Sequence, residues 1–163
     1  MRCGIALGSN LGDRMAHLRT GMAAVRLLHD ENEPLPISQV YETEPVDETP
    51  DTPEYLNAVV EIEYKGDALE LLRVLQQIEQ REGRPAEHAY HAPRTLDLDI
   101  LYLGDTILQT PELTLPHPRM TERRFVLQPL ADIRPELILP GFQQTVAQLL
   151  AGLPPEPGVR VVP

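Results

Sequence analysis

The chain has 163 residues, of which 42% are apolar, and its net charge is −11. This composition fits one globular domain with a sizeable core and argues against wholesale disorder. The negative charge argues against nucleic acid and anionic membranes as partners, and no apolar run approaches the roughly 20 residues of a membrane span. The single cysteine allows no internal disulfide, so we expect a reduced, cytoplasmic protein.

Apolar periodicity predicts the elements along the chain. The predicted strands are, in order, 2–7, 36–42, 55–64 and 96–103, the last forming a hairpin with 106–109. The predicted helices run to about residue 29 (with Ser9 and Asn10 as possible N-caps), over 67–81, and near 121–131 and 143–151. Two Pro-rich loops, 43–54 and 83–93, separate these elements.

The order strand, helix, strand, strand, helix, strand predicts an α+β, ferredoxin-like domain. Its sheet would be mostly antiparallel, with the two long helices packed on one face. We expect residues 1–163 to form a single domain, with a core over about 1–150 and an extended Pro-rich tail at 154–163. The loops 43–54 and 83–93 would then flank a site.

The most informative motif is the run P-R-T-L-D-L-D-I at 93–100. Successive side chains of a strand point to opposite faces, so Asp97 and Asp99 share one face, with their roots roughly 6.5 Å apart. Two carboxylates so placed suit Mg²⁺, which takes the rest of its ligands from water and substrate phosphates. Arg94 could bind a phosphate at the same rim. The alternative is a pair of aspartates that meet only water.

The distribution of charge supports an anionic ligand. Residues 30–63 contain eleven acidic residues and no Lys or Arg, whereas 81–124 contain six arginines and three histidines. A basic pocket in an acidic protein favours a small polyanion, bound mainly by arginine. The spacing of Gly4, Gly8 and Gly12 matches neither a dinucleotide-binding loop nor a P-loop, so these glycines are expected to serve a tight turn and close packing.

Five further side chains are candidates for ligand contacts. Tyr55 and Asn57 lie two apart on a predicted strand and, with Phe125, suit stacking and edge recognition of a flat heterocycle. For Tyr55 and Phe125 the alternative is a place in the core. Glu79, at the edge of a helix's apolar stripe, could orient a loop residue or a nucleotide, or simply face solvent. His117, between two prolines, could donate to a phosphate or be structural.

Several motifs occur in one order along the chain. They are G-S-N-L-G at 8–12, Y-E-T-E-P at 41–45, Y-L-N at 55–57, I-E at 78–79, G-R at 83–84, P-R-T-L-D-L-D-I at 93–100, L-T-L-P-H at 113–117 and R-R-F-V-L-x-P-L at 123–130. Together they closely resemble the 6-hydroxymethyl-7,8-dihydropterin pyrophosphokinases of folate biosynthesis. The resemblance runs from about residue 4 to residue 140.

The resemblance implies an enzyme that transfers pyrophosphate from ATP to the hydroxymethyl group of the pterin, leaving AMP. It implies two Mg²⁺ ions, bound with ATP and held by Asp97 and Asp99, and catalytic roles for these two residues and for Arg84 and Arg94. The implied ATP contacts are Leu72, Gln76, Arg84, Arg94, Ile100, Thr114, His117 and Arg123, and Glu79 is assigned to the same site from its place on the helix. The implied pterin contacts are Thr43, Pro45, Val46, Tyr55, Asn57 and Phe125, with His91 where the best-known members carry a tryptophan that closes over the ligands.

We therefore expect a monomer that binds ATP and a dihydropterin, and neither nucleic acid nor membrane. One alternative is a nucleotidyl or phosphoryl transferase with another acceptor. The other is a non-catalytic, nucleotide-binding, ferredoxin-like regulatory module. The aromatic and amide pair at Tyr55 and Asn57 favours the pterin, because sugar or protein acceptors would not need it.

Overall fold

The computed structural model describes residues 1–43, 54–83, 95–155 and 158–163. The strands are β1 (Arg2–Ser9), β2 (Tyr41–Thr43), β3 (Tyr55–Glu63), β4 (Asp97–Leu103), β5 (Leu108–Gln109), β6 (Thr114–Leu115) and β7 (Val159–Val161). The helices are α1 (Arg14–Arg26), α2 (Ala68–Arg81), α3 (Arg124–Ile133) and α4 (Val146–Ala151), with a 3-10 turn, η1 (Met120–Glu122), before α3. No helix in these ranges is long and apolar enough to cross a membrane.

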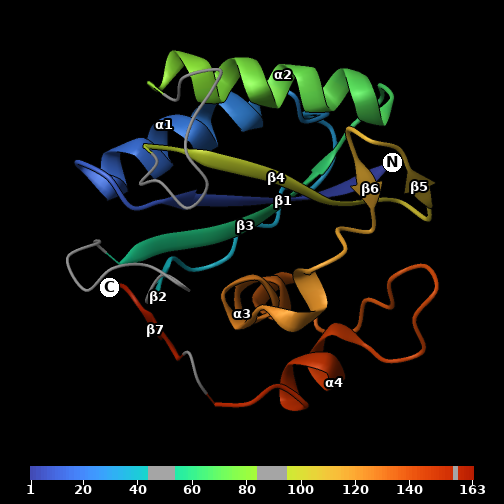
Figure 1. Ribbon diagram of the computed structural model, residues 1–163. Coiled ribbons are helices and arrows are strands. Elements are labelled where there is room, and N and C mark those ends of the chain that lie inside the picture. Colours follow the sequence, from blue (N-terminus) through green and yellow to red (C-terminus); the bar gives the residue numbers. More distant parts are fainter. Residues whose placement is uncertain (44–53, 84–94, 156–157) are drawn as a thin grey trace.

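The main sheet has the strand order β4-β1-β3-β2-β7, and every neighbouring pair is antiparallel. With α1 after β1 and α2 after β3, this is the predicted α+β, ferredoxin-like arrangement. Both α1 and α2 lie on one face of the sheet, and α3 lies on the other with α4 beside it (Figure 1). The expectation that the two long helices share one face is confirmed.

Strand alternation divides the apolar residues between two cores. Toward α1 and α2, the sheet contributes residues such as Leu7 and Leu98, which pack with the apolar stripe of α2 that contains Leu71 and Leu75. Toward α3, a second cluster forms around Val59 of β3. Full burial of each such side chain favours folding by about 1.5–3 kcal/mol, so both layers are held to a rigid sheet.

The first helix begins differently from the prediction. Its N-cap is Asp13, whose side chain accepts from the Ala16 amide at 3.1 Å, so neither Ser9 nor Asn10 fills that role. The reason is that β1 continues to Ser9, which places the helix start farther along the chain.

Three other segments pair unexpectedly. The strand predicted at 36–42 is regular only over Tyr41–Thr43, with one isolated bridge at Ile37, in a stretch where Pro34 and Pro36 cannot donate backbone hydrogen bonds. The hairpin predicted between 96–103 and 106–109 is wrong, because β5 pairs with β6 instead of β4. The Pro-rich tail was expected to be extended; among its described residues, the β7 segment (Val159–Val161) adds to the sheet beside β2.

Candidate active site

One row of residues across the sheet brings the predicted site together. Asp97 of β4 is paired with Gly8 of β1, and Gly8 is paired with Asn57 of β3. Paired residues of adjacent strands share a face, and this is the face toward α3. Asp99 lies in the next row, opposite Ala6. The predicted metal carboxylates and the predicted pterin amide therefore lie on one surface, two strand spacings or about 10 Å apart.

Gly8 is the residue that leaves this surface open. A Cβ at this position would lie 3.2 Å from Asn57 Oδ1 and 3.7 Å from Tyr55 Cδ1. Gly8 was expected to serve a turn, yet it lies inside β1. Its role comes from its register against β3 and β4, which no local sequence pattern indicates. Sequence reasoning therefore missed a residue at the centre of the candidate site.

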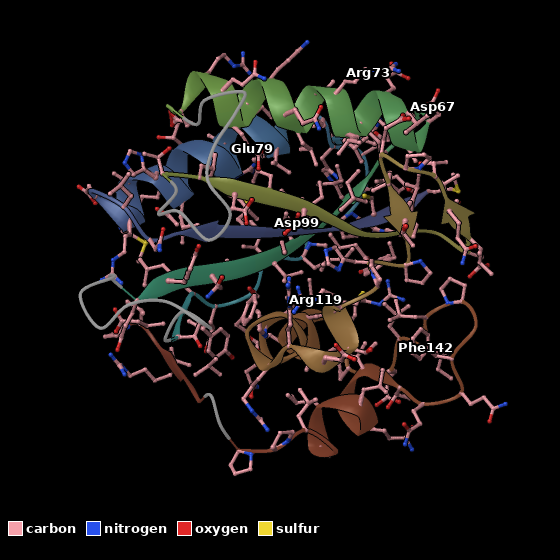
Figure 2. All side chains as sticks on the ribbon, viewed as in Figure 1. Asp67, Arg73, Glu79, Asp99, Arg119 and Phe142 are labelled. Carbon is pink, nitrogen blue, oxygen red and sulfur yellow. The ribbon has the colours of Figure 1, made fainter. Side chains whose placement is uncertain are left out.

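Asp97 and Asp99 are both half-buried, and the side chain of Leu98 between them enters the opposite core. The Leu98 amide, at the edge of the sheet, donates to Glu79 Oε2 at 2.8 Å. Figure 2 shows Glu79 under α2, Asp99 at the sheet, and Arg119 on the side of α3. Glu79, only 7% exposed, thus fixes the backbone between the two aspartates. Its contact with ATP stays a prediction.

The donor set fits Mg²⁺. Two hard carboxylates stand on a rigid strand with partial access to solvent. The described residues hold no group of three or more His, Cys, Asp or Glu side chains that could form an all-protein metal site. Mg²⁺ ordinarily needs only one or two carboxylates, because waters and substrate phosphates complete its octahedral shell.

His117 lies beside β4, where its amide donates to the Leu101 carbonyl at 2.8 Å. Its Nδ1 accepts from the Arg119 amide at 3.2 Å, which assigns the proton of the neutral ring to Nε2. Burial lowers the pKa of His117, and the positive charges of Arg123 and Arg119 lower it further, while Asp97 acts in the opposite direction. His117 therefore presents a neutral N–H donor near the carboxylates.

The helix α3 is fixed over this surface at two points. The Tyr41 hydroxyl donates to the Asp132 carboxylate at 2.8 Å, and Arg134 Nη1 donates to the buried carboxylate of Glu61 at 2.6 Å. Burial and the neighbouring Asp132 raise the pKa of Tyr41 to about 12, so this phenol stays a donor. These contacts hold the half-buried Phe125 on the face that carries the candidate site.

Two predicted pterin contacts and one ATP contact lie near this face. Thr43 is paired with Tyr55 at the adjoining ends of β2 and β3, and its hydroxyl donates to the Gly158 carbonyl at 3.2 Å. The guanidinium carbon of Arg123 lies 5.5 Å from the centroid of the Phe125 ring, within range of a cation–π contact. Arg123 and Phe125 are thus close neighbours at the start of α3.

The remaining predicted ATP contacts are more scattered. On α2, Leu72 is half-buried and Gln76 is exposed, and Thr114 is half-buried on β6. Ile100 is 2% exposed in the core toward α1 and α2, so its side chain has almost no surface for a ligand, and its adenosine contact stays a prediction. The predicted site residues that lie outside the described residues are Pro45, Val46, Arg84, His91 and Arg94.

Comparison with known proteins finds a protein family that the chain matches. A family model described as 7,8-dihydro-6-hydroxymethylpterin-pyrophosphokinase (HPPK) matches residues 4–135. The chain is 43% identical over 159 residues to the 2-amino-4-hydroxy-6-hydroxymethyldihydropteridine pyrophosphokinase of Bacillus subtilis, covering 96% of this chain and 87% of that protein. It is 38% identical to the enzyme of the same name from Pseudomonas aeruginosa, covering 98% and 95%.

The fold also matches solved structures. The HPPK-DHPS protein of Plasmodium falciparum, solved as the S436F/A437G/A613S triple mutant with SDX-DHP, superposes with a TM-score of 0.69 over 92% of this chain, at 17% identity. The chain spans 44% of the length of that protein. At this identity the likeness bears on the fold alone.

Proposed function

Because the chain belongs to the HPPK family, the pyrophosphokinases of folate biosynthesis, we propose that it transfers pyrophosphate from ATP to the hydroxymethyl group of 6-hydroxymethyl-7,8-dihydropterin in a Mg²⁺-dependent reaction. The observation that carries the proposal is the row Asp97–Gly8–Asn57 on one face of the sheet. With Asp99 in the next row of β4, this arrangement sets two carboxylates that suit Mg²⁺ about two strand spacings from the amide of Asn57.

At the pterin end, Asn57 reads the edge of the ring. Its side chain is buried, and its Nδ2 has no hydrogen-bond partner among the described residues. A buried amide without a partner costs about 1–3 kcal/mol, which an acceptor on the ring would recover. Tyr55 and Phe125 supply aromatic faces for the heterocycle, and Gly8 gives it room to lie against the sheet.

At the phosphate end, Asp97 and Asp99 would hold the Mg²⁺ ions. Bound there, Mg²⁺ would supply charge neutralisation of the triphosphate and help to orient it toward the acceptor hydroxyl. The neutral N–H of His117 donates to a phosphate oxygen, and Arg123 adds a positive charge at the same end. Two ions are proposed, as the family resemblance implies.

The chemistry needs positioning more than covalent assistance. The hydroxymethyl oxygen forms a bond to the β-phosphorus of ATP, the bond from that phosphorus to the oxygen bridging to the α-phosphate breaks, and AMP leaves. The hydroxyl proton is released. Glu79 contributes indirectly, because its hydrogen bond to the Leu98 amide keeps both aspartates on their face of β4.

The test is product analysis with ATP, 6-hydroxymethyl-7,8-dihydropterin and Mg²⁺, followed by ³¹P NMR. We expect AMP and a pterin diphosphate only when all three are present. Formation of ADP would indicate a simple phosphoryl transfer, and absence of AMP under all conditions would refute the proposal. Asp97→Asn serves as the control for a contaminating activity.

A further inference from the structure

The terminal strand β7 lies beyond residue 135, where the match to the family model ends. It pairs antiparallel with β2, with Arg160 opposite Glu42 and Val159 opposite Thr43. The pairing continues one residue further, where the Val162 amide donates to the Val40 carbonyl at 2.8 Å. Figure 1 shows β7 along the outer side of β2, near the end of β3 where that strand begins. The strand therefore reaches the part of the sheet that carries Thr43 and Tyr55.

Four charged residues meet at this corner, and we call them the ion-pair cluster: Arg14, Glu42, Glu54 and Arg160. Arg160 Nη2 lies 2.5 Å from Glu42 Oε1 and 2.7 Å from Glu54 Oε2. Arg14 Nη1 lies 2.8 Å from Glu42 Oε2 and 2.7 Å from the Glu54 carbonyl oxygen. Glu42 thus receives one arginine on each oxygen, and both arginines also hold Glu54.

The cluster sits directly behind predicted pterin contacts. Glu42 precedes Thr43 on β2, and Glu54 precedes Tyr55, the residue paired with Thr43. Because strand side chains alternate, the side chain of Glu42 lies on the α1 side of the sheet, while Thr43 and Tyr55 face the side of α3. Among the described residues, the backbone of β2 and of the start of β3 joins the cluster to the pterin surface.

We propose that Arg160 is a positioning residue for pterin binding, because it ties the end of β2 to the start of β3 from the terminal strand. This inference rests on the proposed function. Isolated surface ion pairs contribute little, but four charges sharing partners form a network, and Thr43 is held to β7 a second time through the Gly158 carbonyl. The nucleotide end, on β4 and α2, has no described contact with the cluster.

The test compares two affinities in the full-length protein. Titration calorimetry measures 6-hydroxymethylpterin in the presence of a non-hydrolysable ATP analogue and Mg²⁺, and separately the ATP analogue alone. Arg160→Gln should weaken pterin binding about threefold to tenfold and change nucleotide binding less than twofold. Arg160→Lys should recover part of the loss, since it keeps the charge without the planar fork. Arg26→Gln, an exposed arginine at the end of α1, is the matched control and should change neither affinity.

A double-mutant cycle separates positioning from general stability. Once Arg160→Gln is present, adding Glu54→Gln should cost less pterin affinity than it does in the wild type, because the two residues act through one contact. Pterin affinity unchanged in Arg160→Gln, or equal losses for both ligands, would overturn the inference while leaving the proposed function intact. A wild-type protein that binds no pterin would overturn both.

Discussion

Substitution of Gly8 by alanine tests the candidate site most directly. Gly8 lies between Asp97 and Asn57 in one row of the sheet. The added methyl group would meet Asn57 Oδ1 at 3.2 Å, closer than a relaxed contact, and Tyr55 Cδ1 at 3.7 Å, an ordinary contact. The amide of Asn57 must therefore move by a few tenths of an ångström, and the surface beside it gains a methyl group where the pterin ring would lie.

The magnitude follows from the cost of overpacking. Inserting a methyl group into a well-packed site costs about 1–3 kcal/mol. Asn57 is 6% exposed and can adjust slightly in the free protein, so we assign most of this cost to the complex, in which the ring also needs the space. Pterin affinity should fall by roughly 5- to 150-fold, while affinity for an ATP analogue with Mg²⁺ stays within about twofold.

The assay is calorimetry with 6-hydroxymethylpterin, with thermal unfolding measured in parallel. Gly152→Ala is the matched control, because a Cβ there would lie no closer than 3.6 Å to its neighbours and its φ is −83°. It should leave both affinities unchanged. The reasoning is refuted if Gly8→Ala binds the pterin as tightly as the wild type while folding equally well.

Four other substitutions give three independent tests. Asp97→Asn and Asp99→Asn should each lower turnover at least about 100-fold with little change in unfolding temperature, because each weakens the binding of Mg²⁺. Near-normal turnover of either variant at saturating Mg²⁺ would contradict the metal assignment. Gly4→Ala should instead destabilise the fold by about 1–3 kcal/mol in urea, because its Cβ would lie 2.4 Å from the Tyr102 ring; an unchanged midpoint would show that the ring moves freely. The pKa of His117 is lowered from 6.5, so the neutral ring favours folding above that value and this stability is lost as the pH falls through the lower folded pKa. His117→Gln should therefore lose less stability than the wild type on acidification below pH 6.5 without Mg²⁺, and identical pH profiles would argue against a buried neutral imidazole.

Local patterns predicted what depends on neighbours in the sequence. Period-two alternation correctly set Leu98 into the core, with Asp97 and Asp99 on the other face. The apolar stripe of α2 was equally readable, because i, i+3 and i+4 spacing needs no knowledge of the partner. The N-cap of α1 was missed because Ser9 and Asn10 are as competent as Asp13, and the extent of β1 decides among them.

Such local patterns cannot predict the pairing register between strands that are far apart in the sequence. That Gly8 lies opposite both Asn57 and Asp97 depends on pairing between strands about 50 and 90 residues distant in sequence. The same holds for Arg160, whose partners Glu42 and Glu54 lie more than 100 residues earlier. A strand of three residues is too short to show a period-two pattern, so the sequence predicted only an extended tail where β7 lies.

Two rows of paired residues on the α3 side of the sheet each have a glycine of β1 between a residue of β4 and a residue of β3. They differ in what occupies the space over the glycine. In the first, Tyr102, Gly4 and Glu61 are paired across β4, β1 and β3. The Tyr102 ring lies where a side chain on Gly4 would be, and its hydroxyl donates to Glu61 at 2.5 Å. Burial and Glu61 raise the pKa of Tyr102, so the phenol remains a donor, and both Arg134 and Arg2 pair with the carboxylate. The chain thus supplies both the ring and the polar partner, and this row is structural.

The second row places Asp97, Gly8 and Asn57 on the same three strands. Here the glycine again leaves room beside a buried polar group, but no described group accepts a hydrogen bond from Asn57 Nδ2. A buried amide in this condition costs about 1–3 kcal/mol, which folding alone does not recover. A flat ring with a hydrogen-bonding edge would cover Gly8 and form a hydrogen bond with Asn57, as Tyr102 covers Gly4 and forms a hydrogen bond with Glu61. Within one sheet, the difference between a structural row and a binding row is therefore whether the protein or its proposed substrate provides the ring over the glycine.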